Sequence, residues 1–564
     1  MARWIKWLDP ILSSTALVIL ILFLGKFGGP DHFIAAQILR ALTYLLIIFF
    51  SIYLVLQIIQ LPKRLDQIEA RLFDLAIFLP LVLTRGDPQI SASLIIFRQI
   101  IVNIYRLIRI KRVMEFLDTL QRYPARLLAG SFLILIVFGT VLLALPISSE
   151  SGQGFNLVDS LFTATSATCV TGLVVIDTAT QFSLFGEIII LLLIQAGGLG
   201  IMALSASAAA LIGKRMALGQ KVLMQHLFEA SDYEDLKKVI FYIIRFTFLS
   251  ELIGAILLTI RFNMHMHDLV GAFYYGIFHA VSAFCNAGFA LWSNNLENFV
   301  DDPVVNITIT SLIILGGIGF TVIGPLWGFP KMFLKYRMGA FRRLNVHAQM
   351  VLITTGILLV SGFLFFLMVE SNHAFSGLDL SGKLWASFFH SVTARTAGFN
   401  TVTISNFQMP SLFFFTVLMF IGASPGSAGG GIKTTTMATL FLTARSMIIK
   451  RSDVEFAGRR LPETFIIKAI SIFVLALVVI PAGILILLIT EKASFMEVLF
   501  EVISAFGTVG LSMGLTSKLT LLGKLSITLL MFIGRLGPLT VALIAGESTK
   551  EASYRYPKGE VLIG

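Results

Sequence analysis

Hydrophobic residues fill this chain in long runs that short polar stretches separate. Many of the runs hold the roughly 20 apolar residues that a helix needs to cross a bilayer. From about residue 125 onward one pattern recurs four times: a long apolar run, a half-length run, a loop of small and polar residues, and a second long run. The half-length runs are too short to cross the bilayer, so we predict that they enter it and turn back. The pattern predicts an all-α polytopic membrane protein.

These repeats set the expected domain organisation. We predict a four-helix membrane extension over residues 1–115 and a C-terminal tail over residues 547–564. The four pore units between them cover residues 125–213, 238–330, 345–448 and 462–546. The half-length pore helices are predicted at Leu157–Thr168, Ala272–Phe284, Leu384–Ala394 and Phe495–Phe506. The second spanning helices are predicted at Phe185–Leu211, Val304–Trp327, Leu412–Leu442 and Leu521–Ala545.

A four-residue loop ending in glycine follows each half-length run. Glycine reaches positive φ without steric cost, so successive backbone carbonyls can point at one axis. Rings of carbonyls replace the hydration shell of a cation in ion channels, and the C-terminal end of a pore helix favours a cation nearby. We therefore predict a K⁺ selectivity filter of which one chain supplies all four quarters. The quarters are Cys169, Val170, Thr171 and Gly172; Cys285, Asn286, Ala287 and Gly288; Arg395, Thr396, Ala397 and Gly398; and Gly507, Thr508, Val509 and Gly510.

The second long run of the third unit departs from the others between Gly422 and Gly431. Its density of glycine and proline is incompatible with an ordinary helix, so we expect a broken helix with a loop at membrane depth. A loop of small residues below the filter can block a narrow pore and move aside. The same segment nearly matches a phosphate-binding P-loop, but Ile432 interrupts the motif and no strand precedes it. The expected gate residues are Gly426, Ser427, Gly429, Gly430 and Gly431, with Lys433 at the inner edge.

Two arginines interrupt the apolar pattern of the pore units. Arg535 lies within the run from Ile527 to Ile544, where a charged side chain must face a wet cavity or a polar partner. It can act as an electrostatic barrier to ions, hold the gate loop, or serve as a structural arginine that binds helix carbonyls. Arg395 occupies the loop position that holds cysteine or glycine in the other units. Because filter ligands are carbonyls, we expect its side chain to lie behind the filter and brace the loop.

Composition and charge support the membrane assignment and exclude other classes. Hydrophobic residues make up 56% of the 564 residues and charged residues 13%, about half of what a soluble protein carries. The net charge of +11 comes from lysines and arginines gathered in alternate loops, which is the positive-inside pattern rather than a nucleic-acid surface. We therefore expect a multi-pass plasma-membrane protein whose filter loops open to the outside. No enzyme motif in its structural context is present.

The first 115 residues carry a second possible function. Arg98 is followed by Arg106, Arg109 and Arg112 at a spacing of three, and Asp74 on the preceding stretch can supply a counter-charge. Arginines at this spacing are typical of a helix that senses membrane potential. The alternative is that they form the positive inner flank of a span, in a segment that serves packing or assembly.

The motifs, taken in order, resemble those of the Trk/Ktr/HKT superfamily of potassium transporters. The resemblance implies potassium selectivity, because all four filter positions are glycine. It also implies a homodimer with one pore per chain, a tail at the dimer interface, and a cytosolic ring of nucleotide-binding RCK subunits. The nucleotide is then expected on that partner, and no cofactor on this chain. The matching stretches are Ser282–Phe289, Thr393–Asn400, Ser424–Thr434 and Met531–Thr540.

We therefore predict potassium uptake across a bacterial inner membrane. The chain has no ATP site, so the electrochemical gradient is the expected driving force, with sodium or proton coupling left open. One alternative is a voltage-dependent cation channel that residues 1–115 control. Another is a non-conducting membrane subunit that docks a cytosolic regulator.

Overall fold

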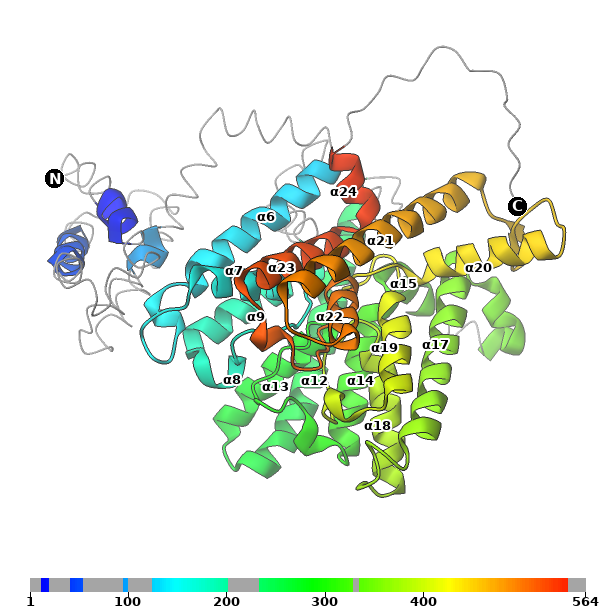
Figure 1. Cartoon of the computed structure of the whole chain (residues 1–564), viewed down its shortest axis with the longest axis horizontal. Helices are drawn as coiled ribbons and strands as arrows, with labels where there is room; N and C mark the ends of the chain where they lie inside the picture. The colour runs from blue at the N-terminus through cyan, green and yellow to red at the C-terminus, as the bar shows by residue number, and fades with distance from the viewer. Residues whose placement is uncertain are drawn as a thin grey trace, which may run out of the picture.

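The computed structural model describes residues 12–19, 41–53, 95–99, 124–200, 233–327 and 334–545. Figure 1 shows that these residues are almost entirely helical, as predicted, and that most helices run obliquely past one another. Three described helices are long and apolar enough to cross a membrane, and a bent helix pair makes a fourth. The fold is that of an all-α polytopic membrane protein.

Each of the four units begins with a first helix and continues with a short pore helix. A polar side chain caps each pore helix by accepting a hydrogen bond from a backbone N–H of its first turn, and the caps are Asn156, Asp268, Asp379 and Ser494. The first helices are α6 (Pro124–Leu143), α12 (Tyr233–Met266), α17 (Val346–Glu370) and α21 (Glu463–Thr490). The pore helices are α7 (Leu157–Thr168), α13 (Leu269–Phe284), α18 (Leu380–Thr393) and α22 (Phe495–Gly507), which lie where the apolar pattern predicts them.

The second helices of the second and fourth units are interrupted as well as that of the third, which corrects the prediction that only the third is broken. In the first unit, α9 (Leu184–Leu199) ends at Gly200, and residues 201–211 lie outside the described part of the chain. In the second, α14 (Pro303–Ile318) and α15 (Phe320–Trp327) meet at an angle of 104°. In the fourth, α23 (Leu521–Leu536) and α24 (Pro538–Ala545) are separate helices. The third unit has α19 (Met409–Phe420) and α20 (Thr434–Ile448), with the predicted loop between them.

A glycine with positive φ lies at the break in the second and fourth units and at the end of α9 in the first. Gly200, Gly319 and Gly537 have φ of 74°, 95° and 84°. This left-handed backbone is costly for residues with a Cβ atom, and glycine adopts it freely. The residues around these glycines are largely apolar, with Arg535 as the exception, so the apolar pattern alone predicts a continuous helix.

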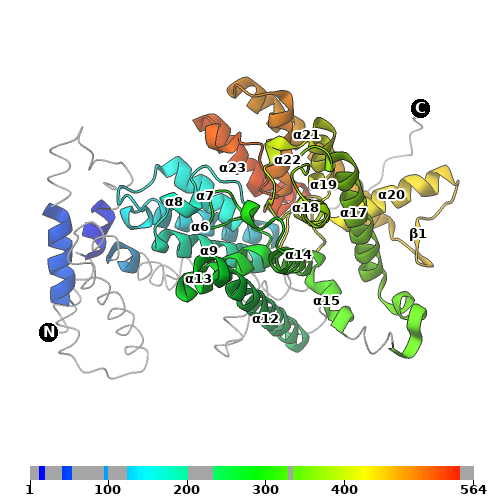
Figure 2. The same ribbon diagram turned by 90° about the horizontal axis from the view of Figure 1, so that it is seen from below.

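The four units follow one another around the molecule in chain order (Figure 2). Helix α9 of the first unit contacts α13 of the second, α14 contacts α18 of the third, and α19 contacts α22 of the fourth. The circle closes because α23 of the fourth unit packs against α7 of the first. This arrangement brings the ends of the pore helices together at the centre.

Buried histidines pack the second and third pore helices in the same way. His279 and His390 are fully buried, and in each the Nδ1 atom lies 2.8 Å from the backbone oxygen four residues earlier, Tyr275 and Ala386. The His279 Nε2 atom also accepts a hydrogen bond from the Leu291 N–H at 3.3 Å. Each ring is surrounded by aromatic side chains, so the two helices are held by equivalent packing.

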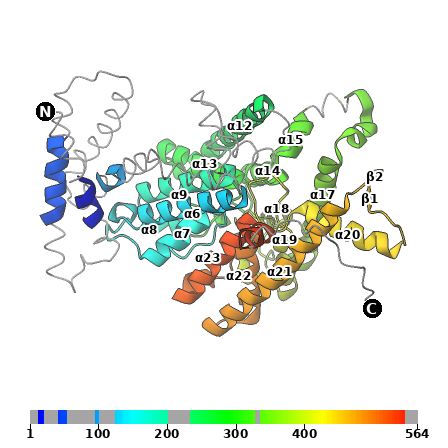
Figure 3. The same cartoon turned by 90° about the horizontal axis from the view of Figure 1, so that it is seen from above.

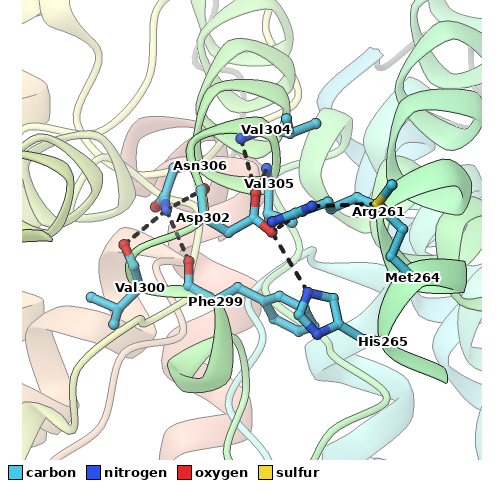
Figure 4. A network of polar contacts seen from close by, with 9 residues as sticks. All are labelled: Arg261, Met264, His265, Phe299, Val300, Asp302, Val304, Val305 and Asn306. Carbon is cyan, nitrogen blue, oxygen red and sulfur yellow. Dashed lines mark hydrogen bonds and ion pairs between the residues drawn. The ribbon is translucent and has the colours of Figure 1, made fainter. Parts of the chain in front are cut away.

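A polar network ties α12 to the start of α14 (Figure 4). The Asp302 carboxylate caps α14 by accepting hydrogen bonds from the Val304 and Val305 N–H groups, at 3.0 and 3.2 Å. The same carboxylate pairs with the Arg261 guanidinium of α12. The Asn306 amide then donates to the backbone oxygens of Phe299, Val300 and Asp302.

One small β-hairpin interrupts the helical fold, and the sequence pattern does not predict it. Strands β1 (Glu455–Phe456) and β2 (Arg459–Arg460) pair antiparallel beside α20 (Figure 3). The turn residues Ala457 and Gly458 have φ of 51° and 75°, as a tight hairpin turn requires. The remaining short elements are α8 (Thr178–Gln181) and the 3₁₀ turns Pro146–Ser148, Glu297–Phe299, Arg337–Arg343, Ile404–Asn406 and Thr516–Lys518.

Parts of the N-terminal extension are helical, at residues 12–19, 41–53 and 95–99. Phe97 packs edge-on against Phe185 of α9, with 5.7 Å between the ring centroids. The predicted sensor residues Asp74, Arg106, Arg109 and Arg112 lie outside the described residues, and so does the predicted tail over residues 547–564.

Candidate functional site

The four glycine loops share one backbone conformation. Their final glycines have φ of 91°, 70°, 80° and 93° at Gly172, Gly288, Gly398 and Gly510. The residue two positions earlier is also left-handed in every loop, although none of these residues is a glycine. These residues are Val170, Asn286, Thr396 and Thr508, with φ of 55°, 60°, 71° and 50°. Because the same two positions adopt left-handed φ in all four loops, the loops are structurally equivalent.

The glycines also lie directly against the neighbouring loop. A Cβ atom on Gly288 would lie 2.7 Å from the Ala397 carbonyl oxygen, and one on Gly398 would lie 2.6 Å from the Val509 oxygen. In the same way, Gly172 abuts the Ala287 oxygen and Gly510 abuts the Thr171 oxygen. Each glycine therefore meets the carbonyl that precedes the glycine of the next unit, and the fourth unit returns to the first. The contacts form a closed ring.

A buried hydroxyl of the pore helix supports each loop from behind. In the first unit, Ser166 Oγ donates to the Leu173 oxygen at 2.8 Å and accepts from the Gly172 N–H at 3.1 Å. Ser282 donates to the Phe289 oxygen at 2.8 Å, and Ser504 accepts from the Gly510 N–H at 3.1 Å. These hydroxyls were not singled out in the sequence, although each stands at a fixed distance before its glycine.

The third loop uses a threonine and is one residue shorter. Thr393 Oγ1 donates to the Phe399 oxygen at 2.6 Å, the bond that Ser282 makes in the second unit, but Thr393 lies one position nearer its glycine. The backbone hydrogen bonds show the same difference. The Ala397 N–H donates to the Thr393 oxygen, four residues earlier, whereas the Ala287 N–H donates to the Ser282 oxygen, five residues earlier. The sequence shows the same difference, with five positions from Thr393 to Gly398 and six from Ser282 to Gly288.

The Arg395 side chain lies behind its loop. It is buried, at 8% exposure, and its Nη2 atom lies 3.4 Å from the Gly422 oxygen. It lines a small cavity together with Ile313, Thr355 and Val392, away from the four glycines. Its guanidinium thus connects the third glycine loop to the start of the Gly422–Gly431 loop.

The Gly422–Gly431 loop lies directly beneath the glycine ring. The Gly430 N–H donates to the Thr508 hydroxyl at 3.1 Å, and Gly429 abuts the Thr396 hydroxyl. The loop also reaches the second unit, because the Ala428 N–H donates to the Gly316 oxygen at 3.1 Å. Glycines are required here because side chains would overlap the residues above them. The loop therefore spans the centre of the circle of units.

Two cations hold this loop from either side. The Lys433 Nζ atom donates to the Gly429 oxygen at 2.7 Å. The Arg535 guanidinium donates from one nitrogen to the Ala428 oxygen and from the other to the Gly197 oxygen of α9. Arg535 thus joins the fourth unit, the loop of the third and the second helix of the first.

Glycines of the second helices let those helices touch the pore-helix ends. Gly197, Gly316 and Gly534 abut the carbonyl oxygens of Thr168, Phe284 and Phe506, respectively, so closely that a methyl group would not fit. These three oxygens belong to the last turns of the pore helices α7, α13 and α22. This contact fixes where the helix dipoles point, which is toward the space under the ring.

A cavity above the ring opens away from the Gly422–Gly431 loop. All four ring glycines line it, together with the carboxylates of Asp177 and Glu297. Ser293 donates to Asp177 at 2.5 Å, and Asn400 and Thr403 donate to Glu297, both at 2.9 Å. Among its described lining residues there is no lysine or arginine. The cavity is therefore electronegative.

A family model described as "TrkH: Cation transport protein" matches residues 96–554. The Ktr system potassium uptake protein B of Bacillus subtilis is 40% identical over 445 residues, covering 78% of this chain and 97% of that protein. The protein of the same name from Vibrio alginolyticus is 40% identical over 441 residues, with 78% and 94% covered. The potassium/sodium uptake protein NtpJ of Enterococcus hirae is 36% identical over 452 residues, with 78% and 97% covered.

The fold is also similar to a solved structure. The crystal structure of the potassium transporter TrkH from Vibrio parahaemolyticus aligns with a TM-score of 0.63 and 17% sequence identity, over 90% of this chain and 98% of that one. This likeness concerns the architecture, whereas the family match and the identities above concern the sequence itself. The chain therefore belongs to the TrkH family of cation transport proteins.

Proposed function

We propose that this chain is the membrane subunit of a potassium uptake system and that its four glycine loops form the selectivity filter. The observation that carries the proposal is the closed ring, in which each glycine meets a backbone carbonyl of the next unit. Such a ring surrounds a single axis with backbone oxygens, which is the arrangement that replaces the water around a cation. The names of the relatives, which include potassium uptake proteins from two bacteria, support potassium as the ion.

The ion path follows from the order of the features along this axis. The electronegative outer cavity with Asp177 and Glu297 attracts cations from outside. Ions lose water in the ring and then meet the Gly422–Gly431 loop beneath it. We propose this loop as the gate, held closed by the bonds from Lys433 and Arg535 to its carbonyl oxygens. The family is one of transporters and not of enzymes, and the electrochemical gradient is the proposed driving force.

The assembly is proposed on the family resemblance. It consists of two copies of this chain in a bacterial inner membrane, each with its own pore, and a cytosolic RCK ring that carries the regulatory nucleotide. No cofactor is proposed on this chain itself. Because one relative is named a potassium/sodium uptake protein, dependence of uptake on sodium is part of the proposal and is tested by varying external sodium.

The test is rubidium-tracer uptake in cells without their own potassium uptake systems. Gly288→Ser places a Cβ atom at a left-handed residue and against the Ala397 oxygen, so we expect uptake to be lost or to admit sodium. Gly356→Ser is the matched control, because nothing lies within 4 Å of a Cβ atom at that glycine of α17. Equal potassium uptake and selectivity in both variants would overturn the filter assignment.

A further inference from the structure

A second cavity lies at the opposite end of the molecule from the outer cavity, beside the Gly422–Gly431 loop. Residues near the starts of α17 and α21, residues of α20 and the β1–β2 hairpin line it. We call it the hairpin pocket. Its lining residues used below are Val346, Met350, Pro425, Lys433, Arg459, Arg460, Phe465, Lys468, Ala469 and Ile472.

The polar half of the hairpin pocket is strongly basic. Arg459, Arg460 and Lys468 are exposed at its rim, and Lys433 lies deeper. Arg460 is paired with Asp453 at 3.0 Å and lies 3.9 Å from Glu463, whereas Arg459 and Lys468 have no ion pair with any described residue. The described lining contains no carboxylate. The pocket therefore has an excess of positive charge that an anion can neutralise.

The other half is apolar and continues onto the membrane-facing surface. Val346 and Met350 of α17 line it together with Phe465, Ala469 and Ile472 of α21. Phe465 is 58% exposed, and it lies in the first turn of a helix long and apolar enough to cross a membrane. The pocket thus combines cations with an apolar wall at the point where a membrane span begins, which is the level of the lipid head groups.

We propose that the hairpin pocket binds an anionic phospholipid of the cytosolic leaflet. The phosphate group pairs with Arg459 and Lys468, and an acyl chain lies along Phe465 and Ile472. Basic residues at the inner end of a span attract anionic lipid head groups. A free phosphate would satisfy only the cations, and a zwitterionic lipid would leave the excess positive charge in place.

The pocket touches the Gly422–Gly431 loop at Pro425 and, just after the loop, at Lys433. Lys433 Nζ binds the Gly429 oxygen. A phosphate in the pocket attracts the Lys433 ammonium group away from that oxygen and so weakens one of the two bonds that hold the loop. We therefore expect anionic lipid to raise the rate of uptake. This effect on transport rests on the proposed gate, whereas lipid binding does not.

The experiment uses the full chain, purified and placed in nanodiscs of phosphatidylcholine with and without phosphatidylglycerol. Native mass spectrometry then measures the phosphatidylglycerol retained per protein after release. We expect Arg459→Gln with Lys468→Gln to weaken its retention roughly tenfold or more, since two cations are removed. Lys450→Gln with Arg451→Gln is the control, because it removes the same charge from two exposed residues that follow α20 and lie outside the pocket, at the cost of one exposed ion pair between Arg451 and Glu455.

The same samples distinguish the other occupants of the pocket. Retention of both lipids to the same extent, or equal losses in the pocket and control variants, would overturn the lipid site. Displacement of phosphatidylglycerol by millimolar glycerol phosphate would assign the pocket to a soluble phosphate compound and would also overturn it. Rubidium uptake into liposomes of the two compositions tests the link to the gate separately, and equal rates there would remove that link even where the lipid binds.

Discussion

The Arg535 guanidinium donates a hydrogen bond to the Ala428 carbonyl oxygen and thereby joins the last pore unit to the loop of the third. Its second bond, to the Gly197 oxygen, anchors the same side chain to the first unit. Together the two bonds hold the loop in the position described. Among the three roles that the sequence allows for Arg535, this geometry favours holding the loop, and it makes that role testable.

We expect Arg535→Gln to raise the maximal rate of rubidium uptake about threefold or more, because bonds from a charged donor contribute about 1.5–3 kcal/mol each. Arg535→Lys separates the roles, since it keeps the charge but cannot reach two carbonyls in the forked geometry. Uptake that rises in both variants indicates a brace. A rise with glutamine and none with lysine indicates an electrostatic barrier and contradicts the proposed brace.

The hydroxyl behind the first glycine loop should control ion affinity. Ser166→Ala removes one hydrogen bond to the Leu173 oxygen and one from the Gly172 N–H in a fully buried site. Leaving these groups unpaired costs about 1–3 kcal/mol, so we expect the rubidium concentration at half-maximal uptake to rise several-fold. Ser526→Ala on the exposed side of α23 serves as the control. An unchanged half-saturation value for Ser166→Ala would show that the loop needs no support from this hydroxyl.

The second helix of the second unit offers a matched pair of glycines. Gly316→Ala places a methyl group against the Phe284 oxygen at the end of the pore helix, whereas Gly324 has nothing within 4 Å of its Cβ position. Overpacking of this kind costs about 1–3 kcal/mol, and here it also displaces the pore helix. We expect lower thermal stability in detergent and less uptake for Gly316→Ala, with Gly324→Ala close to the wild type. Equal stabilities would contradict the close packing.

The network in Figure 4 makes a prediction about stability alone. Asp302→Asn retains an oxygen that can cap α14 but loses the charge that pairs with Arg261. Because Asp302 is 7% exposed, we expect a loss of about 1–3 kcal/mol and a lower temperature of thermal unfolding. Asp302→Ala should lower that temperature further, because the cap is lost as well. Equal temperatures for the two variants would mean that the cap contributes nothing.

The sequence predicts the pore helices well because their features are local. A polar cap, an apolar run of fixed length and a terminal glycine all lie within a few residues, as in Leu157–Thr168. The apolar pattern does not predict the breaks at Gly319 and Gly537, because glycines within an apolar run are equally compatible with close helix packing. Whether such a glycine breaks the helix or packs within a continuous one depends on contacts with the neighbouring unit, which the local sequence does not contain.

The site was predictable to a similar extent. The loop glycines follow from their spacing, and the position of Arg395 follows from the rule that carbonyls coordinate the ion. The partners of Arg535 could not be predicted, since Ala428 and Gly197 come from two other units and provide only backbone oxygens. Backbone acceptors leave no signature in the sequence, so long-range bonds to them emerge only from the fold.

The closed ring of glycine contacts has a consequence for how such a pore can vary. In a ring built from four identical subunits, any change in the gene alters every quarter at once. Here Gly172, Gly288, Gly398 and Gly510 are separate codons of one chain, so each quarter can be altered alone. In the proposed filter, ion preference can therefore change in single steps while three quarters stay intact, and a mutant chain contains no mixture of altered and normal subunits.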